Sequence, residues 1–143
     1  MNKLKNKVVS LRLAKKMKTL GFKQDSLFYW IRMSDKRYKK RWYCTYYPSG
    51  ETPANDVQVD RFCSAYISEE IGEMFPAGIC QDRRTQKSKY GTEVVSLNIC
   101  PKWQKGERRY VLYLAGCMFY TQSDKETDAR AKMAIYLRTN KLI

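Results

Sequence analysis

The sequence contains no histidine. This removes Ser/His/Asp and Cys/His nucleophilic centres, histidine general bases and histidine metal ligands together. Glycine is also sparse, with 7 in 143 residues, and neither G-x-G-x-x-G nor G-x-x-x-x-G-K-[ST] occurs. The phosphate-cradling loops of nucleotide-binding enzymes are therefore missing. We predict no catalytic residue and no cofactor, and expect a protein that is not an enzyme.

Metal-binding patterns are missing as well. Zinc ribbons and fingers need ligand pairs two to four residues apart, and no such pair of cysteines exists. No aspartate or glutamate is followed by lysine two residues later, so the usual restriction-nuclease signature is absent. We predict no metal site, and we expect free thiols that are mostly small buried side chains at the five cysteines, Cys44, Cys63, Cys80, Cys100 and Cys117.

Long hydrophobic runs are absent. The longest, Val111 to Tyr120, is ten residues, well short of the roughly 18 that a membrane span needs. The lysine-rich start at residues 1–7 is not followed by the apolar stretch of a signal peptide. These patterns favour a soluble, cytoplasmic protein that does not bind membranes.

Positive charge is what the chain has in excess. It carries 28 lysines and arginines against 14 aspartates and glutamates, a net charge of +14. Residues 1–41 hold 14 basic and 2 acidic side chains, residues 42–79 hold 1 and 6, and residues 80–143 hold 13 and 6. Such a balance indicates a polyanionic or acidic partner. The acidic middle either neutralises nearby lysines or keeps that face away from a polyanion.

Three helices are predicted, near residues 10–20, 68–75 and 124–139. The first has Ser10 as its expected N-cap and Gly21 at its left-handed end. The second has Ser68 as its expected N-cap, with acidic residues in its first turn and Pro76 beyond it. The third begins with the capping box Ser123 to Glu126 and carries acid-first i,i+4 pairs, Glu126–Arg130 and Asp128–Lys132.

Runs of aromatic and branched residues predict strands. Residues 26–33 and 41–47 form the expected hairpin, with the polar connector 34–40 as its exposed tip. Further strands are expected at 61–67, 92–99, 108–114 and 117–121. We therefore predict an α+β fold, one domain over residues 1–143, with an antiparallel sheet of about four to six strands and three helices.

Four segments carry a family resemblance. They run from Leu11 to Phe22, over Leu27-Phe-Tyr-Trp30, over Glu70-Ile-Gly-Glu-Met-Phe-Pro76 and over Asp128-Ala-Arg-Ala-Lys-Met-Ala-Ile-Tyr-Leu137. Together, about half of the chain resembles small proteins encoded in phages and prophages. The resemblance implies a phage or mobile-element origin. Because the shared motifs are helix and core patterns, it implies no activity, and the chain departs from it in its basic N-terminal third and its hairpin tip.

Residues 28–47 combine aromatic and basic side chains more densely than the rest of the chain. Cations can neutralise phosphates and exposed rings can stack on unpaired bases. The alternative is a solvated tip that protects the sheet edge, with the rings in the core. We predict an accessory protein that binds nucleic acid, or else a module that docks on an acidic protein. The candidate contact residues are Lys36, Arg37, Lys39, Lys40, Arg41 and Trp42 at the tip and Arg83, Arg84, Lys87 and Lys89 in a second loop; the first helix, with Arg12, Lys15 and Lys16, is the other possible location.

Overall fold

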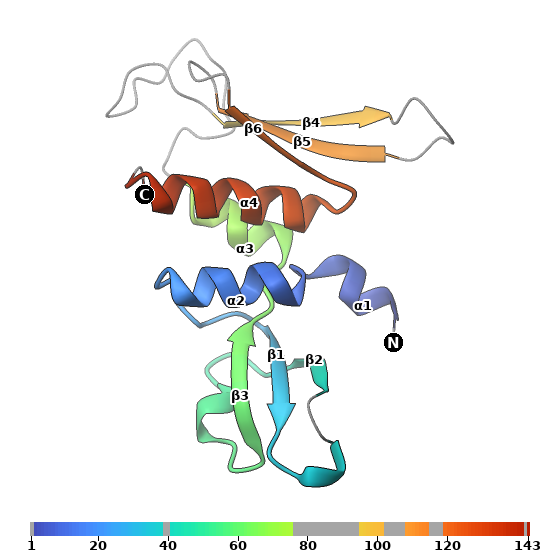
Figure 1. The fold of residues 1–143 in the computed structure, drawn as a ribbon, viewed down its shortest axis with the longest axis vertical. Coiled ribbons are helices and arrows are strands. Elements are labelled where there is room, and N and C mark those ends of the chain that lie inside the picture. The colour runs from blue at the N-terminus through green and yellow to red at the C-terminus, as the bar shows by residue number, and fades with distance from the viewer. Residues whose placement is uncertain (1, 39–40, 76–94, 102–107, 115–118, 142) are drawn as a thin grey trace. The chain divides into compact units, whose positions relative to one another are not determined.

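The computed structural model describes residues 2–38, 41–75, 95–101, 108–114, 119–141 and 143. These residues form an α+β fold, as predicted (Figure 1). Its elements are α1 (Asn2–Lys7), α2 (Leu11–Thr19), β1 (Phe28–Met33), β2 (Trp42–Tyr46), β3 (Val59–Ser64), α3 (Ser68–Glu73), β4 (Val95–Pro101), β5 (Arg108–Leu114), β6 (Phe119–Ser123) and α4 (Glu126–Thr139).

The prediction of one sheet and three helices is wrong in both counts. The described strands lie in two separate antiparallel sheets of three, ordered β2-β1-β3 and β4-β5-β6. The described helices number four. By their internal contacts the residues divide into two compact units, Met1–Glu70 and Ile71–Ile143, here called unit 1 and unit 2. The single domain over residues 1–143 stays a prediction.

The predicted hairpin is confirmed as the centre of unit 1. β1 pairs antiparallel with β2, from Phe28 opposite Tyr46 to Arg32 opposite Trp42. β3 adds to the other edge of β1, also antiparallel. Tyr29, Trp30 and Ile31 are all buried although neighbours on a strand face opposite sides. The central strand is therefore covered on both of its faces.

Helix α2 ends as the sequence predicts. Gly21 has φ +78°, the left-handed conformation that favours glycine. The Phe22 N–H then donates to Met17 O at 3.1 Å, and the Gly21 N–H donates to Lys18 O at 3.0 Å. This is the Schellman arrangement, and both apolar partners, Met17 and Phe22, are buried. At the other end Ser10 precedes the helix as expected, but its side chain makes no capping hydrogen bond.

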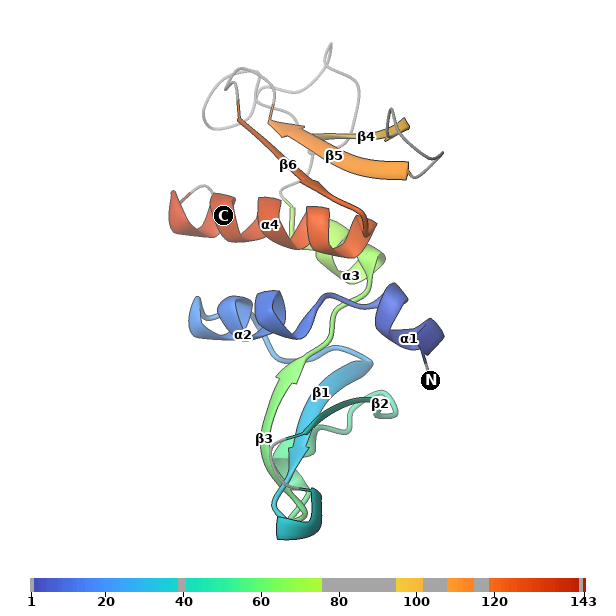
Figure 2. The same cartoon turned by 45° about the vertical axis from the view of Figure 1, so that its right-hand side comes forward.

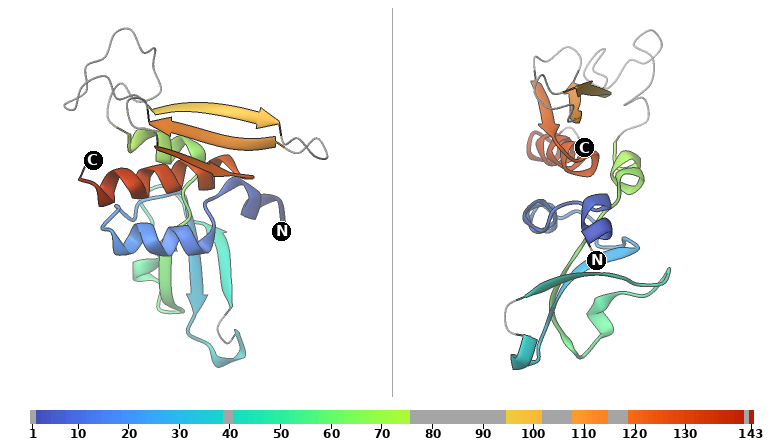
Figure 3. Two further views of the ribbon diagram at one scale, coloured as in Figure 1. Left: turned by 45° about the horizontal axis from the view of Figure 1, so that its top comes forward. Right: turned by 90° about the vertical axis from the view of Figure 1, so that its right-hand side faces the viewer.

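Helix α1 was missed because nothing in its sequence signals it. Its lysines, Lys3, Lys5 and Lys7, are exposed, and Leu4 is half-buried, so there is no apolar stripe to detect. Tertiary contacts just after it hold the segment in place. Val8 bridges to Ile67, and the Val9 N–H donates to Tyr66 O at 2.8 Å. Figure 3 shows α1 and α2 following one another beside the first sheet.

The end of unit 1 is closed by the carboxylate of Glu70. Its oxygens accept hydrogen bonds from Ser26 Oγ at 2.8 Å, from the Leu27 N–H at 3.0 Å and from the Ile67 N–H at 2.9 Å. The last of these caps the first turn of α3, which begins at Ser68 as predicted. Glu70 thus ties the start of β1 to the segment that follows β3.

In unit 2, α4 packs on strands β5 and β6 (Figure 2). Thr121 of β6 donates its hydroxyl to Ala129 O of α4 at 2.8 Å. Met133 and Leu137 of α4 are fully buried. β4 pairs antiparallel with β5, and β6 lies antiparallel on the other edge of β5.

The predicted start of this helix was two residues early. Ser123 is the last residue of β6, and Lys125 occupies the N-cap position without a side-chain capping bond. The Glu126–Arg130 pair is confirmed at 2.8 Å. The Asp128–Lys132 pair is wrong, because Asp128 lies 3.8 Å from Lys125 and the Lys132 ammonium donates to Gln122 O instead.

Candidate nucleic-acid interface

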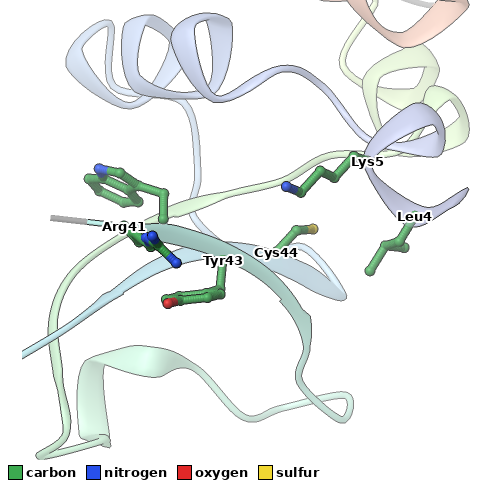
Figure 4. A pocket seen from close by; sticks show the side chains of 6 residues that line it. Leu4, Lys5, Arg41, Tyr43 and Cys44 are labelled. Atoms are coloured by element: carbon green, nitrogen blue, oxygen red, sulfur yellow. The ribbon is translucent and has the colours of Figure 1, made fainter. Parts of the chain in front are cut away.

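A hollow of about 530 Å³ lies in unit 1 between α1 and β2. Figure 4 shows the Lys5 side chain reaching from α1 toward the strand that carries Tyr43 and Cys44. Arg41 stands just before that strand and is exposed. The residues that line this hollow, here called the Trp42 pocket, are Leu4, Lys5, Arg41, Trp42, Tyr43 and Cys44.

A third cation, Lys15 of α2, reaches the Trp42 ring. The Lys15 ammonium lies 4.3 Å from the centre of the Trp42 ring, within cation–π distance. Trp42 is half-buried, so its ring is held by its surroundings and still reaches the surface. Lys5 and Arg41, which line the pocket, and Lys15, which lies over the indole, thus come from three segments to the surface around Trp42.

The outer side of α2 is basic along its length. Arg12, Lys15, Lys16 and Lys18 are exposed, whereas Leu13, Ala14 and Met17 are buried. This division is the one that the sequence predicts. Lys18 has a structural use of its own, because its ammonium lies 4.1 Å from the Phe62 ring centre and donates to Phe62 O at 2.6 Å.

At the hairpin tip the structure separates residues that the sequence grouped. Lys36 and Arg41 are exposed and form no ion pair with a carboxylate that the structure describes. Arg37 instead binds Asp35, through Nε at 3.0 Å and Nη2 at 2.8 Å. This guanidinium holds the pKa of the Asp35 carboxyl below its ordinary value. Arg37 therefore stabilises the short 3₁₀ turn Lys36–Tyr38 and has less of its charge to offer a ligand.

The remaining predicted contact residues lie outside the described residues. They are Lys39, Lys40, Arg83, Arg84, Lys87 and Lys89. Sequence reasoning in turn missed Lys5, which lines the pocket, and gave Lys15 only a secondary place. A usable signal was present, because residues 1–24 contain eight basic side chains and no acidic one.

The carboxylates of unit 1 are placed elsewhere. Asp25 pairs with Lys23 at 2.7 Å, and Asp60 pairs with Arg32. Asp56 accepts hydrogen bonds from Tyr47 and from the Gln58 N–H. Of the residues that the structure describes as lining the Trp42 pocket, none carries a carboxylate. Its electrostatic potential is therefore set by cations.

A second hollow of about 690 Å³ has a mixed character. It is lined by both Asp35 and Arg37, whose charges offset each other, and by Tyr38 and Tyr43, whose rings meet edge to face at 6.5 Å. An anion gains less from such a lining than from the Trp42 pocket.

Cys44 and Cys63 differ in environment. Neither is in a disulfide. Cys63 is buried on β3, and burial raises the pKa of its thiol to about 11, although Lys18 and Lys15 act in the opposite direction. Cys44 is half-buried and lines the Trp42 pocket. Cys44 is therefore positioned to report on the pocket, whereas Cys63 belongs to the core.

No family model, curated protein or solved structure matches the chain. Within the described ranges, no three His, Cys, Asp or Glu side chains come together to hold a metal ion. None of the helices in that part of the chain combines the length and the apolar character needed to cross a bilayer.

Proposed function

We propose that unit 1 binds nucleic acid through the basic surface around Trp42. The protein would then act in the cytoplasm as a non-enzymatic accessory protein of the phage or mobile-element type that its sequence resembles. The observation that carries this proposal is that Lys5 and Arg41 line one pocket with the half-buried Trp42, and that Lys15, from a third segment, lies over the Trp42 ring.

Charge provides the affinity in this proposal. A cation that neutralises a phosphate releases condensed counterions, which favours binding at low salt and makes it salt-dependent. The exposed cations of α2 extend this surface beyond the pocket, with Arg12 and Lys16 forming no ion pair with a described carboxylate. Lys36 adds a further exposed charge at the tip. These residues supply phosphate contacts that carry no sequence information.

The test is a salt titration of binding to labelled DNA and RNA, each as a single strand and as a duplex, between about 50 and 200 mM salt. The variant Lys5→Gln/Arg41→Gln removes two charges from the pocket. The matched control Lys23→Gln/Arg61→Gln removes two exposed charges outside it, so both proteins have the same net charge.

The pocket variant should flatten the plot of log affinity against log salt by about 1.4 on single strands and about 1.8 on duplexes, since each phosphate contact contributes about 0.7 or 0.9. The control should leave the slope within about half of one contact. Equal slopes for both variants would show that the pocket cations make no phosphate contact. Wild-type protein without measurable affinity for DNA or RNA at about 150 mM salt would contradict the proposal and favour docking on an acidic protein.

A further inference from the structure

We infer that the Trp42 pocket takes a single unpaired nucleotide, so that the protein prefers single-stranded over duplex nucleic acid. This inference rests on the proposed function, because it specifies which form of nucleic acid the basic surface holds. In this arrangement the base stacks on Trp42 and the adjoining phosphate meets the cations of the rim.

The size of the pocket suits this ligand. Its volume of about 530 Å³ lies within the range of roughly 300–1,000 Å³ that small-molecule sites occupy. A duplex is too wide to enter such a hollow, and its bases present only their edges in the grooves. An unpaired base exposes its whole ring face and can leave the stack to enter.

The chemistry of the lining matches a base and a phosphate separately. The indole of Trp42 offers a flat ring, and stacking on it tolerates any base. Tyr43 is less suited to that role because its ring already meets Tyr38 edge to face. Lys5 and Arg41 offer charge for the phosphate. The Lys15 ammonium lies over one face of the indole, so the base stacks on the opposite face. Apolar Leu4 completes the wall on the α1 side.

The pocket depends on α1 being held in place by the folded unit 1. Leu4 and Lys5 belong to a helix whose sequence gives it no amphipathic stripe. The bridge from Val8 to Ile67 fixes the chain directly after this helix. The hollow therefore exists only once unit 1 has folded, and an unfolded chain keeps the charges but loses the pocket.

The first test compares Trp42→Leu with Tyr46→Leu. Both remove one aromatic ring from β2, but Tyr46 is 56% exposed and does not line the pocket. Trp42→Leu should weaken binding of an oligothymidylate of about 16 nucleotides by about 5- to 100-fold. Its affinity for a duplex of equal length should change by less than about 3-fold, because phosphate contacts dominate there. Tyr46→Leu should bind both ligands like the wild type.

The second test uses the unmodified protein, so that it stays informative if Trp42→Leu does not fold. Alkylation of Cys44, measured by mass spectrometry of the peptide that contains it, should slow several-fold when the single-stranded oligonucleotide saturates the protein. A duplex at the same fractional saturation should leave the rate of Cys44 alkylation within about 2-fold of the rate in the free protein. Cys63 is buried and serves as the internal reference for unfolding.

Two results would overturn the inference without touching the proposed function. One is tight binding of the single strand with no protection of Cys44. The other is an equal loss of single-strand and duplex affinity in a folded Trp42→Leu protein, which would make Trp42 a support for the basic surface and not a base-stacking residue. Absence of any binding would instead remove the proposed function itself.

Discussion

We expect the stability of unit 1 to depend strongly on the half-buried carboxylate of Glu70. Its side chain accepts three hydrogen bonds, from Ser26 and Leu27, which precede β1, and from Ile67, which follows β3. The variant Glu70→Ala removes all three acceptors at once. The neighbouring Glu69 is exposed and makes none of these bonds, so Glu69→Ala is a matched control with the same loss of charge from the same helix turn.

The expected loss of unfolding free energy depends on how far each of the three donors is buried once its acceptor is removed. The Ser26 side chain lies in a residue that is only 5% exposed, so its hydroxyl loses its partner away from water. The half-buried Ile67 N–H loses its partner too, whereas Leu27 is exposed and its N–H can bind water. A buried donor left without a partner costs about 1–3 kcal/mol, less where water reaches it. We expect Glu70→Ala to lower the free energy of unfolding by about 2–3 kcal/mol and Glu69→Ala to change it by less than about 0.5 kcal/mol.

Urea unfolding followed by tryptophan fluorescence measures this difference. Trp30 and Trp42 lie in unit 1 and the third tryptophan, Trp103, belongs to unit 2, so the variants are made in a Trp103→Phe background, in which the signal reports on the unit that Glu70 closes. Equal m-values are required for the two variants to be compared as stability changes. A Glu70→Ala protein as stable as Glu69→Ala would mean that the three hydrogen bonds contribute nothing net, and the reasoning would be refuted.

The remaining predictions concern the core. Cys63 should react with iodoacetamide much more slowly than Cys44 at neutral pH, since its thiol is buried and its pKa is raised to about 11. The raised pKa means that the fold favours the neutral thiol, so the stability that this group contributes is complete below about pH 9 and is lost as the pH rises through about 11. Urea unfolding at several alkaline pH values should therefore show a smaller loss of unfolding free energy in Cys63→Ala than in the wild type. Identical pH profiles for the two proteins would contradict this. In unit 2, Met133→Ala and Leu137→Ala should each lower the free energy of unfolding by about 2–4 kcal/mol, because both side chains are fully buried in α4. A cooperatively folded unit 2 that lacks residues 124–143 would show that α4 is not part of its core.

Local signals in the sequence predicted the local parts of the fold. The hairpin of β1 and β2 follows from two aromatic runs around a polar connector, and its antiparallel pairing is confirmed. Gly21 predicted the left-handed end of α2 because few other residues adopt that conformation. The outcome differs where tertiary contacts decide. Ser123 matched a capping box, yet it completes β6 and the helix starts later. Among the described strands, only β1 and β3 pair without being consecutive, and local periodicity does not encode which strands share a sheet.

The candidate site shows the same division. The basic and aromatic composition around the tip pointed to Arg41 and Trp42, and both line the pocket. Sequence density could not reveal that Asp35 would bind Arg37, because the two residues meet through a turn geometry. Nor could it place Lys5 and Lys15 beside Trp42, since the helices that carry them are separated from β2 along the chain. Which charges share one surface is a property of the tertiary fold.

The separation in sequence between Ser26 and Glu70 has a kinetic consequence. The tie between them spans 44 residues, whereas the tight end of the β1–β2 hairpin joins Arg32 to Trp42. Closing the longer loop costs about 1.3 kcal/mol more in chain entropy than closing one of about ten residues. We therefore expect the hairpin to form early and the Glu70 contacts to form after the folding barrier has been crossed. Loss of these contacts should then speed unfolding and leave the folding rate nearly unchanged, so that Glu70 prolongs the lifetime of the native state. Slower refolding of Glu70→Ala in stopped-flow experiments would instead place the contact between Ser26 and Glu70 within the folding nucleus.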